Sequence, residues 1–234
     1  MFVIDLFSGL NGWGEPWKER GHTVISADND KRFNADYQGD LTDVASFVSY
    51  VKSFGIGNPD VILASPPCDA FSVLNIGKNW TVEGEPKTQA AANSIRVVLA
   101  TVDIIKELSP SYWIIENPVA KLRSLDILAG FDRRTVTYCQ YGDARMKPTD
   151  LWGGFPDIQL KKPCIKGSPC HIRAPRGSKT STQGMDKYLA AKIPYQLSLE
   201  ICIAAEKSMG ALHNGNAFGL HPKVGGPIPS VPTK

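Results

Sequence analysis

The sequence predicts an α/β protein with a doubly wound, mostly parallel sheet and helices on both faces. Short β-branched runs alternate with amphipathic stretches, which is the pattern of successive βαβ units. Two of the expected strands, 60–65 and 112–117, have continuous apolar runs, VILA and YWII, as strands buried on both faces do. Polar residues that interrupt these patterns follow strand ends, where open α/β sheets bind their ligands.

The expected elements follow one another at regular spacing. Strands are expected at residues 2–7, 22–28, 60–65, 112–117 and 134–141, and helices at 13–21, 43–55, 88–108 and 193–210. The first helix closes at Gly21, and the last begins near Pro194, a favourable first-turn residue. Apolar residues recur on one face of the second helix, which predicts that this face packs on the sheet.

The chain divides into four parts by composition. Residues 1–153 carry the alternating elements, and 154–187 form a basic, loop-rich segment. Residues 188–212 hold a helix expected to return to the first part, and the Gly- and Pro-rich tail 213–234 is expected to be flexible.

Composition excludes several classes of protein. The 234 residues are 42% hydrophobic and 21% charged, which is ordinary for a globular chain with one sizeable core. No run approaches the ~20 apolar residues of a membrane span. An odd number of cysteines and no secretion signal argue against a disulfide framework and favour the cytoplasm. The net charge of +3 is compatible with a polyanionic partner.

The stretch DLFSGLNGWG joins the first strand to the first helix. Its glycines would let the backbone approach a ligand, although they do not form GxGxxG, so a plain turn is the alternative. Asp28 ends the next strand at the position of a ribose-hydroxyl acceptor, and together these features favour an adenosine-bearing cofactor. Asp40 is a candidate contact to the adenine, or else a helix cap.

A cysteine follows one further expected strand, and a glutamate lies at the end of another. Cys68, in SPPC, taken alone reads as a small buried hydrophobe, and Glu116, in ENP, as part of a turn. At one sheet edge, the thiol could attack a substrate ring while the carboxyl group hydrogen-bonds it.

In order and spacing these motifs resemble the C5-cytosine DNA methyltransferases, in their compact, phage-type branch. The family's cofactor-loop, nucleophile and glutamate motifs correspond to DLFSG, SPPC and ENP. Its Tyr-Gly and basic-residue motif corresponds to YGDARMKPTDLWG, and its last motif to KIPYQLSLEI. The resemblance extends to about residue 206. It implies the class I S-adenosylmethionine-dependent methyltransferase fold, a double-stranded DNA substrate and, we expect, a monomer in a bacterial or infected host cell.

The resemblance also implies roles for individual residues. Cys68 would attack C6 of a flipped cytosine, Glu116 would hydrogen-bond N3, and C5 would take the methyl group of S-adenosylmethionine. Asn117 would shape the pocket wall, with Arg145 and Lys147 near the target nucleotide. The implied cofactor-binding residues are Asp5, Phe7, Ser8, Gly9, Asn11, Gly12, Asp28, Asn29, Asp40 and Pro66.

Three departures from the family pattern stand out. SPPC replaces the commoner Phe-Pro-Cys, Glu-Asn-Pro replaces Glu-Asn-Val, and Thr149 takes the place of an expected arginine. The recognition region has only about forty residues, too few for its own core. Phosphate contacts suit such a segment better than base readout, which predicts a short or relaxed recognition sequence. The candidate DNA-binding residues are Ser72, Lys161, Lys162, Arg173, Arg176 and Lys179.

Several alternatives stay open at this point. SPP also fits an exocyclic amino-methyltransferase acting on N4-cytosine or N6-adenine, and a catalytically silent DNA-binding subunit or an RNA C5-methyltransferase is a further alternative. Lys192 would pair with a glutamate or a DNA phosphate, or else neutralise an anionic group on a modified cofactor. Cys164, Cys170 and His171, with Cys139, form either an ordinary turn or a zinc site.

Overall fold

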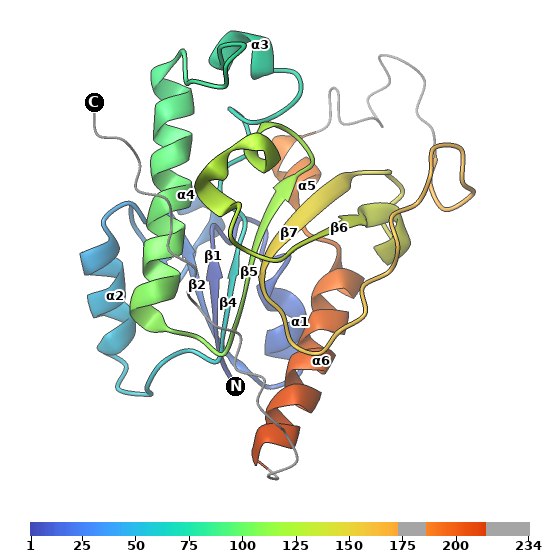
Figure 1. The fold of residues 1–234 in the computed structure, drawn as a ribbon. Helices are drawn as coiled ribbons and strands as arrows, with labels where there is room; N and C mark the ends of the chain where they lie inside the picture. Colours follow the sequence, from blue (N-terminus) through green and yellow to red (C-terminus); the bar gives the residue numbers. More distant parts are fainter. Residues whose placement is uncertain (173–185, 214–234) are drawn as a thin grey trace.

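The computed structural model describes residues 1–172 and 186–213, and these form a mixed sheet flanked by helices (Figure 1). The strand order is β3-β2-β1-β4-β5-β7-β6. The strands are β1 (Phe2–Leu6), β2 (Thr23–Asp28), β3 (Tyr37–Gln38), β4 (Val61–Ala64), β5 (Tyr112–Pro118), β6 (Arg133–Thr137) and β7 (Pro148–Gly154). The α-helices are α1 (Gly14–Glu19), α2 (Val44–Lys52), α3 (Ile76–Asn79), α4 (Gln89–Leu108), α5 (Lys187–Ala191) and α6 (Tyr195–His213). Short 3-10 helices are η1 (Lys31–Phe33), η2 (Lys121–Ser124), η3 (Asp126–Leu128) and η4 (Tyr138–Tyr141).

The direction of the strands sets where a ligand can bind. β1 pairs in parallel with β2 and β4, and β4 pairs in parallel with β5, whereas β7 runs antiparallel to both β5 and β6. The chain runs from β1 outward to β2 and β3, then returns to the other side of β1 at β4. The strand order therefore reverses between β1 and β4, and the loops leaving their carboxyl ends flank the crevice where such sheets bind ligands.

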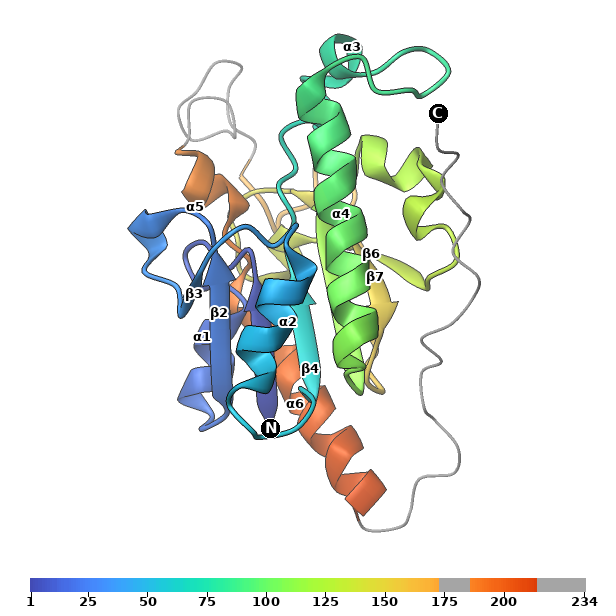
Figure 2. The ribbon, with the colours of Figure 1, turned by 90° about the vertical axis from the view of Figure 1, so that its left-hand side faces the viewer.

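Helices cover both faces of the sheet, as predicted. Figures 1 and 2 show α2 and α4 on one face and α1 and α6 on the other. Alternate β1 residues enter the two cores: Ile4 lies in the core with Phe47 of α2, and Val3 in the core with Trp17 and Leu197 of α1 and α6. The doubly wound fold class and the class I methyltransferase architecture are confirmed.

Two local predictions differ from the structure. The strand expected at 134–141 ends at Thr137, so its second half is wrong; those residues form η4, which closes at Gly142 with a φ of 88°. The sequence also gave no sign of β7, because Pro, Asp and Gly are poor strand formers. The strand forms because β5 and β6 both pair with it. Position 153 must be glycine for this pairing, since a Cβ there would lie 2.0 Å from the Trp113 carbonyl oxygen.

The described part of the segment predicted at 154–187 does not stand apart from the sheet. Phe155, Ile158 and Leu160 pack against the core between the sheet and α6. The expected flexible tail, apart from the last residue of α6, lies outside the described residues, and so does 173–185. The four-part division stays a prediction.

Candidate active site and cofactor pocket

Cys68 lies in the loop that follows β4. Its carbonyl oxygen accepts hydrogen bonds from the backbone N–H groups of Phe71 and Ser72, each at 3.0 Å, so the chain turns tightly just after the thiol. The Asn117 amide donates to the Pro66 carbonyl oxygen at 3.0 Å and ties this loop to the end of β5. The proline pair and this hydrogen bond fix the direction in which the loop leaves the sheet.

Glu116 lies on β5, beside the end of β4, and is only 4% exposed. Its Oε1 accepts a hydrogen bond from the Tyr138 hydroxyl at 2.8 Å. The Lys147 ammonium lies 3.8 Å from the same oxygen and 4.4 Å from the centre of the Tyr138 ring. A buried carboxylate is costly unless it is paired and hydrogen-bonded, and these two residues supply both partners.

The charges of this group act on the thiol. Burial and the Glu116 carboxylate raise the pKa of Cys68 to about 11, and the Lys147 ammonium opposes that rise. Burial and the same carboxylate raise the pKa of Tyr138, so its hydroxyl remains a proton donor to Glu116. The structure thus brings together the thiol, the carboxylate and the lysine that the sequence predicted.

Arg145 and Lys147 converge on one carbonyl group. Arg145 forms a two-pronged ion pair with Asp143 and donates to the Ala190 carbonyl oxygen at 3.4 Å. Lys147 donates to the same oxygen at 3.3 Å. These contacts hold α5 against the site at the point where the chain returns from the segment 173–185.

The loop after β1 has an unusual backbone. Phe7, Gly9 and Asn11 all have positive φ, at 60°, 48° and 55°. This region is uncommon for a residue with a side chain, and a bulky residue there is held by its surroundings. The Gly9 N–H donates to the Asp28 carboxylate at 3.0 Å, which fixes the loop against the end of β2.

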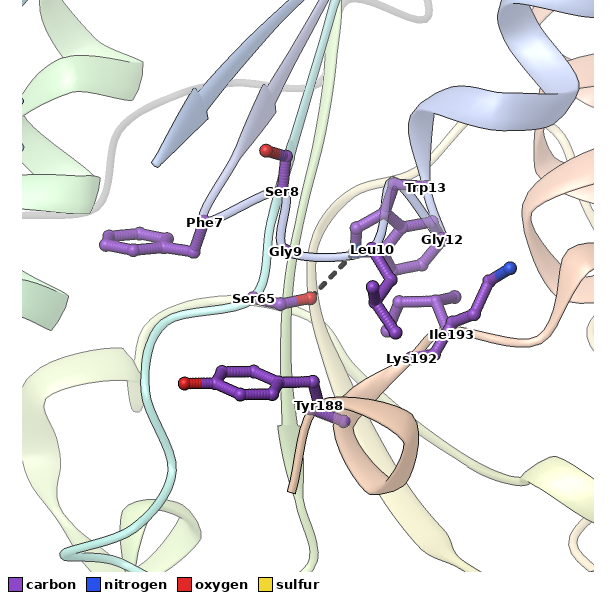
Figure 3. A pocket seen from close by; sticks show the side chains of 11 residues that line it. Phe7, Ser8, Gly9, Leu10, Gly12, Trp13, Ser65, Tyr188, Lys192 and Ile193 are labelled. Atoms are coloured by element: carbon purple, nitrogen blue, oxygen red, sulfur yellow. Dashed lines mark hydrogen bonds between the residues drawn. The ribbon is translucent and has the colours of Figure 1, made fainter. Parts of the chain in front are cut away.

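This loop forms one wall of a pocket, and the connection between α5 and α6 forms another (Figure 3). In Figure 3 the rings of Phe7 and Tyr188 point to the same side, and Leu10 and Lys192 lie on the other. The indole N–H of Trp13 donates to the Ser65 hydroxyl at 2.9 Å and joins the loops after β1 and β4. The lining residues are Phe7, Ser8, Gly9, Leu10, Gly12, Trp13, Ser65, Tyr188, Ala191, Lys192 and Ile193.

Gly12 allows the two walls to meet. A Cβ at this position would lie 2.7 Å from the Ile193 backbone nitrogen and 3.0 Å from its carbonyl oxygen. Only glycine avoids that overlap, so the KIP stretch closes onto the loop after β1, as predicted from the motif. Lys192 lies 3.3 Å from the Glu15 carboxylate, which bears out pairing with a glutamate.

Three buried polar atoms around this loop have no hydrogen-bond partner within the described residues. They are one carboxylate oxygen of Asp5, the Ser8 hydroxyl and the Asn11 side-chain oxygen. The other Asp5 oxygen accepts the Gly14 N–H at 3.0 Å, and burial raises the pKa of Asp5 to about 7. Buried polar groups are normally satisfied, so this region has spare capacity for the polar groups of a ligand.

Several predicted cofactor residues lie beside the pocket rather than in its lining. Both Asp28 carboxylate oxygens accept backbone N–H groups, from Gly9 and from Asp30. Asn29 is exposed in the loop after β2. Asp40 is also exposed and accepts the Thr42 N–H at 2.9 Å. The helix-cap alternative for Asp40 is wrong, because Asp43 caps α2 by accepting the Ser46 N–H.

The predicted DNA-binding residues differ in their surroundings. Lys161 pairs with Glu200 of α6 at 2.8 Å and lies over the Tyr141 ring, whereas Lys162 is exposed. The Ser72 hydroxyl donates to the Asp69 carbonyl oxygen. The remaining candidates, Arg173, Arg176 and Lys179, lie outside the described residues. DNA contact by any of these residues stays a prediction.

Sequence reasoning missed Tyr138 and several lining residues of the pocket, namely Leu10, Trp13, Ser65, Tyr188, Ala191 and Ile193. Tyr138 holds Glu116, and its position in the sequence was expected to be an ordinary strand residue. Tyr188 lines the pocket, and its hydroxyl donates to Asp30 at 3.2 Å while its ring packs edge-on against Phe33 at 4.9 Å. The YGD motif begins at the last residue of η4, close enough to have directed attention to Tyr138. α5 has too few residues to give a periodic signal that would have indicated Tyr188.

Comparison with known proteins agrees with this geometry. The family model described as C-5 cytosine-specific DNA methylase matches residues 1–129. The probable DNA (cytosine-5)-methyltransferase of Frog virus 3 (isolate Goorha) is 26% identical, over 86% of this chain and 98% of the viral protein. The type II methyltransferase M.HgiGI of Herpetosiphon aurantiacus is 28% identical, over 50% of this chain and 90% of that protein.

A solved structure of a putative prophage-encoded DNA modification methyltransferase from E. coli aligns with a TM-score of 0.46 and 18% identity, over 65% of this chain and 46% of that one. No helix within 1–172 or 186–213 has the length and apolar character needed to cross a bilayer. Because the family model matches its first 129 residues, more than half of its length, the chain belongs to the C-5 cytosine-specific DNA methylases.

Proposed function

We propose that this chain transfers a methyl group from S-adenosylmethionine to C5 of a cytosine flipped out of double-stranded DNA, through a covalent adduct with Cys68. The observation that carries the proposal is the coupling of Cys68 to Glu116. The two residues come from adjacent strand ends, and the charge of the carboxylate raises the pKa of the thiol. A nucleophile and an acid-base group at one sheet edge are what attack on C6 of a pyrimidine requires.

The high pKa of the thiol gives Glu116 a second role. With the site empty, burial and the carboxylate both disfavour the thiolate, and Cys68 stays protonated at neutral pH. When cytosine N3 reaches Glu116, the carboxyl group takes up a proton from solvent and holds it against N3. The neutral Glu116 no longer opposes the thiolate, so Cys68 releases its proton to solvent, and the two proton transfers balance.

The bonds change in a balanced order. Cys68 Sγ bonds to C6, and the electrons of the C5–C6 double bond make C5 nucleophilic. S-adenosylmethionine supplies an electrophilic methyl group on its sulfonium sulfur. Once C5 is methylated, a water molecule takes its proton, the C5–C6 double bond reforms, Cys68 leaves as the thiolate, and N3 returns its proton to Glu116.

Tyr138 and Lys147 act on this chemistry through Glu116. The Tyr138 hydroxyl fixes one carboxylate oxygen, and the Lys147 ammonium lies on the same side. The other oxygen is thereby left to face the base. Lys147 also lowers the pKa of Cys68, so it favours the thiolate that attacks.

The pocket beside this group is suited to S-adenosylmethionine. Its lining combines apolar rings with glycine backbone, as adenosine-binding sites do. The unpartnered polar atoms of Ser8 and Asn11 would bind polar groups of the cofactor, and Asp28 would bind the ribose. Asp5 and Pro66 would act through the loops that they hold.

A short recognition segment limits how many bases the chain can read. Its first part packs on the α6 side of the sheet, and Lys161 is paired with Glu200. The described part of the segment thus leaves few side chains for base edges, and we propose that recognition is short or relaxed.

The products of methylation test the proposal. The protein is incubated with S-adenosylmethionine and unmethylated double-stranded DNA, and the DNA is digested to nucleosides for mass spectrometry. We expect 5-methylcytosine from the wild type, at least a hundredfold less from Cys68→Ser, and a large loss from Glu116→Gln. N4-methylcytosine or N6-methyladenine, formed equally well by Cys68→Ser, would identify an amino-methyltransferase instead.

A further inference from the structure

Four side chains that could ligate a metal meet beside η4. They are Cys139 of η4 and Cys164, Cys170 and His171 of the loop that follows β7. Their ligand atoms all lie within 4.8 Å of one another. None of the four has a role in the methyl-transfer chemistry proposed above.

The distances suit a tetrahedral metal ion. Cys139 Sγ lies 3.1 Å from Cys164 Sγ and 3.7 Å from Cys170 Sγ. His171 Nδ1 lies 3.6 Å from Cys164 Sγ and 3.7 Å from Cys170 Sγ. A tetrahedral zinc ion, with its usual bond lengths, separates two sulfurs by about 3.8 Å and a sulfur from a nitrogen by about 3.6 Å. Three of the four separations agree with these values, and the fourth needs the two sulfurs to move apart slightly.

The backbone already holds the ligands in place. The Cys164 N–H donates to the Thr137 hydroxyl at 2.9 Å, just before η4. The Ile172 N–H donates to the Ala144 carbonyl oxygen at 2.9 Å, just after it. These two hydrogen bonds attach the loop to residues on both sides of Cys139. Cys164, Cys170 and His171 all lie in the loop segment from the first attachment to the second.

The ligand-bearing part of this loop, residues 161–172, has only two large aliphatic side chains, and neither packs in a core. Ile165 and Ile172 are 77% and 78% exposed, so neither contributes to a core. Segments too short for a core commonly depend on a metal or a disulfide. A closed set of three thiolates and one imidazole is typical of structural zinc.

We propose that Cys139, Cys164, Cys170 and His171 bind one Zn²⁺ ion that fixes the start of the recognition segment to η4. Binding releases the three thiol protons and forms three Zn–S bonds and one Zn–N bond to Nδ1. The ion would also hold η4, and with it Tyr138, the hydrogen-bond donor to Glu116. The ion would stabilise this short segment in place of the hydrophobic core that a larger recognition domain has.

Metal content tests the proposal directly. The full chain is expressed in zinc-supplemented medium, purified under reducing conditions, and assayed by inductively coupled plasma mass spectrometry. We expect one zinc per chain in the wild type and in Cys202→Ala, whose thiol is buried in α6. Cobalt should replace the zinc and give a thiolate-to-cobalt charge-transfer band with the intense ligand-field bands of tetrahedral cobalt.

Variants at the histidine separate ligation from folding. His171→Ala should bind zinc at least tenfold more weakly, whereas His171→Cys, which restores a fourth ligand, should keep it. Wild-type protein with all three thiols reduced and neither zinc nor cobalt bound would overturn the proposal. So would a Cys139–Cys164 disulfide in protein prepared under reducing conditions, or equal zinc affinity in His171→Ala and the wild type.

Discussion

The Cys68 thiol should respond in opposite directions to the loss of two neighbouring charges. The Glu116 carboxylate raises the pKa of the thiol, and the Lys147 ammonium lowers it. Glu116→Gln should therefore lower this pKa, and Lys147→Met should raise it. Burial, the largest cause of the shift, remains in both variants, so Glu116→Gln should leave the pKa above its ordinary value of 9.0.

The size of the effect follows from the thiolate fraction. With a pKa of about 11, roughly one thiol in a thousand is ionised at pH 8, against roughly one in ten for a pKa of 9.0. Alkylation in the wild type should therefore be roughly a hundredfold slower than at an unperturbed thiol. Glu116→Gln should recover part of this factor, roughly three- to thirtyfold.

Iodoacetamide labelling over a range of pH measures these rates. A tryptic peptide spanning residues 53–78 contains Cys68 and no other cysteine, so mass spectrometry isolates its rate. The pH at which the rate levels off reports the pKa independently of steric access. Asp69→Asn is the matched control, because its exposed carboxylate is a weaker cause of the same shift.

Two results would refute this reasoning. One is a wild-type rate that levels off below about pH 9. The other is a shift of the same sign in Glu116→Gln and Lys147→Met, which would mean that the charges do not reach the thiol as the structure implies.

Three further predictions concern the scaffold. The pKa of Asp5 is about 7 when folded, above its ordinary 3.8, so its contribution to the free energy of unfolding is full below pH 3.8 and is lost as the pH rises to about 7. In urea denaturation, the free energy of unfolding of Asp5→Asn relative to the wild type should rise by at most about 4 kcal/mol from about pH 4 to pH 8. A difference that does not vary with pH would contradict this. Gly12→Ala should weaken cofactor binding at least tenfold in calorimetry, because the new Cβ would overlap the backbone of Ile193 between α5 and α6. Gly77→Ala is the control and should leave binding unchanged, because a Cβ there has no atom within 4 Å. Arg123→Met should lower the free energy of unfolding by about 2–3 kcal/mol, because it leaves the fully buried Asp150 carboxylate without its ion pair; an unchanged denaturation midpoint would contradict this.

The sheet could be predicted from the sequence because its pattern is local. The strands at 60–65 and 112–117 are short apolar runs, and each is bounded by turn residues. β7 carries no such pattern, because its strand character comes from pairing with β5 and β6. Gly153 suits that strand because the Trp113 carbonyl lies against it, and this contact cannot be read from either residue alone.

The candidate site could be predicted as far as motifs reach. Cys68 follows β4 and Glu116 lies near the end of β5, so the parallel pairing of these strands brings them together. Tyr138 and Tyr188 have no motif of their own and reach the site through η4 and α5, two short elements placed by tertiary contacts. The cysteine cluster is intermediate: three candidate ligands are near in sequence, and the folded chain brings Cys139, the fourth candidate, beside them.

Covalent capture tests the central claim most directly. A DNA duplex in which 5-fluorocytosine replaces cytosine is incubated with the protein and S-adenosylmethionine, and the products are separated under denaturing conditions. Because fluorine cannot leave C5 as a proton does, the adduct to Cys68 should persist. We expect a stable protein–DNA adduct in the wild type and in Cys202→Ala, with the DNA attached to the peptide spanning residues 53–78, and none in Cys68→Ser. Methylation of ordinary cytosine in DNA without any such adduct, or an adduct that survives Cys68→Ser, would contradict the account.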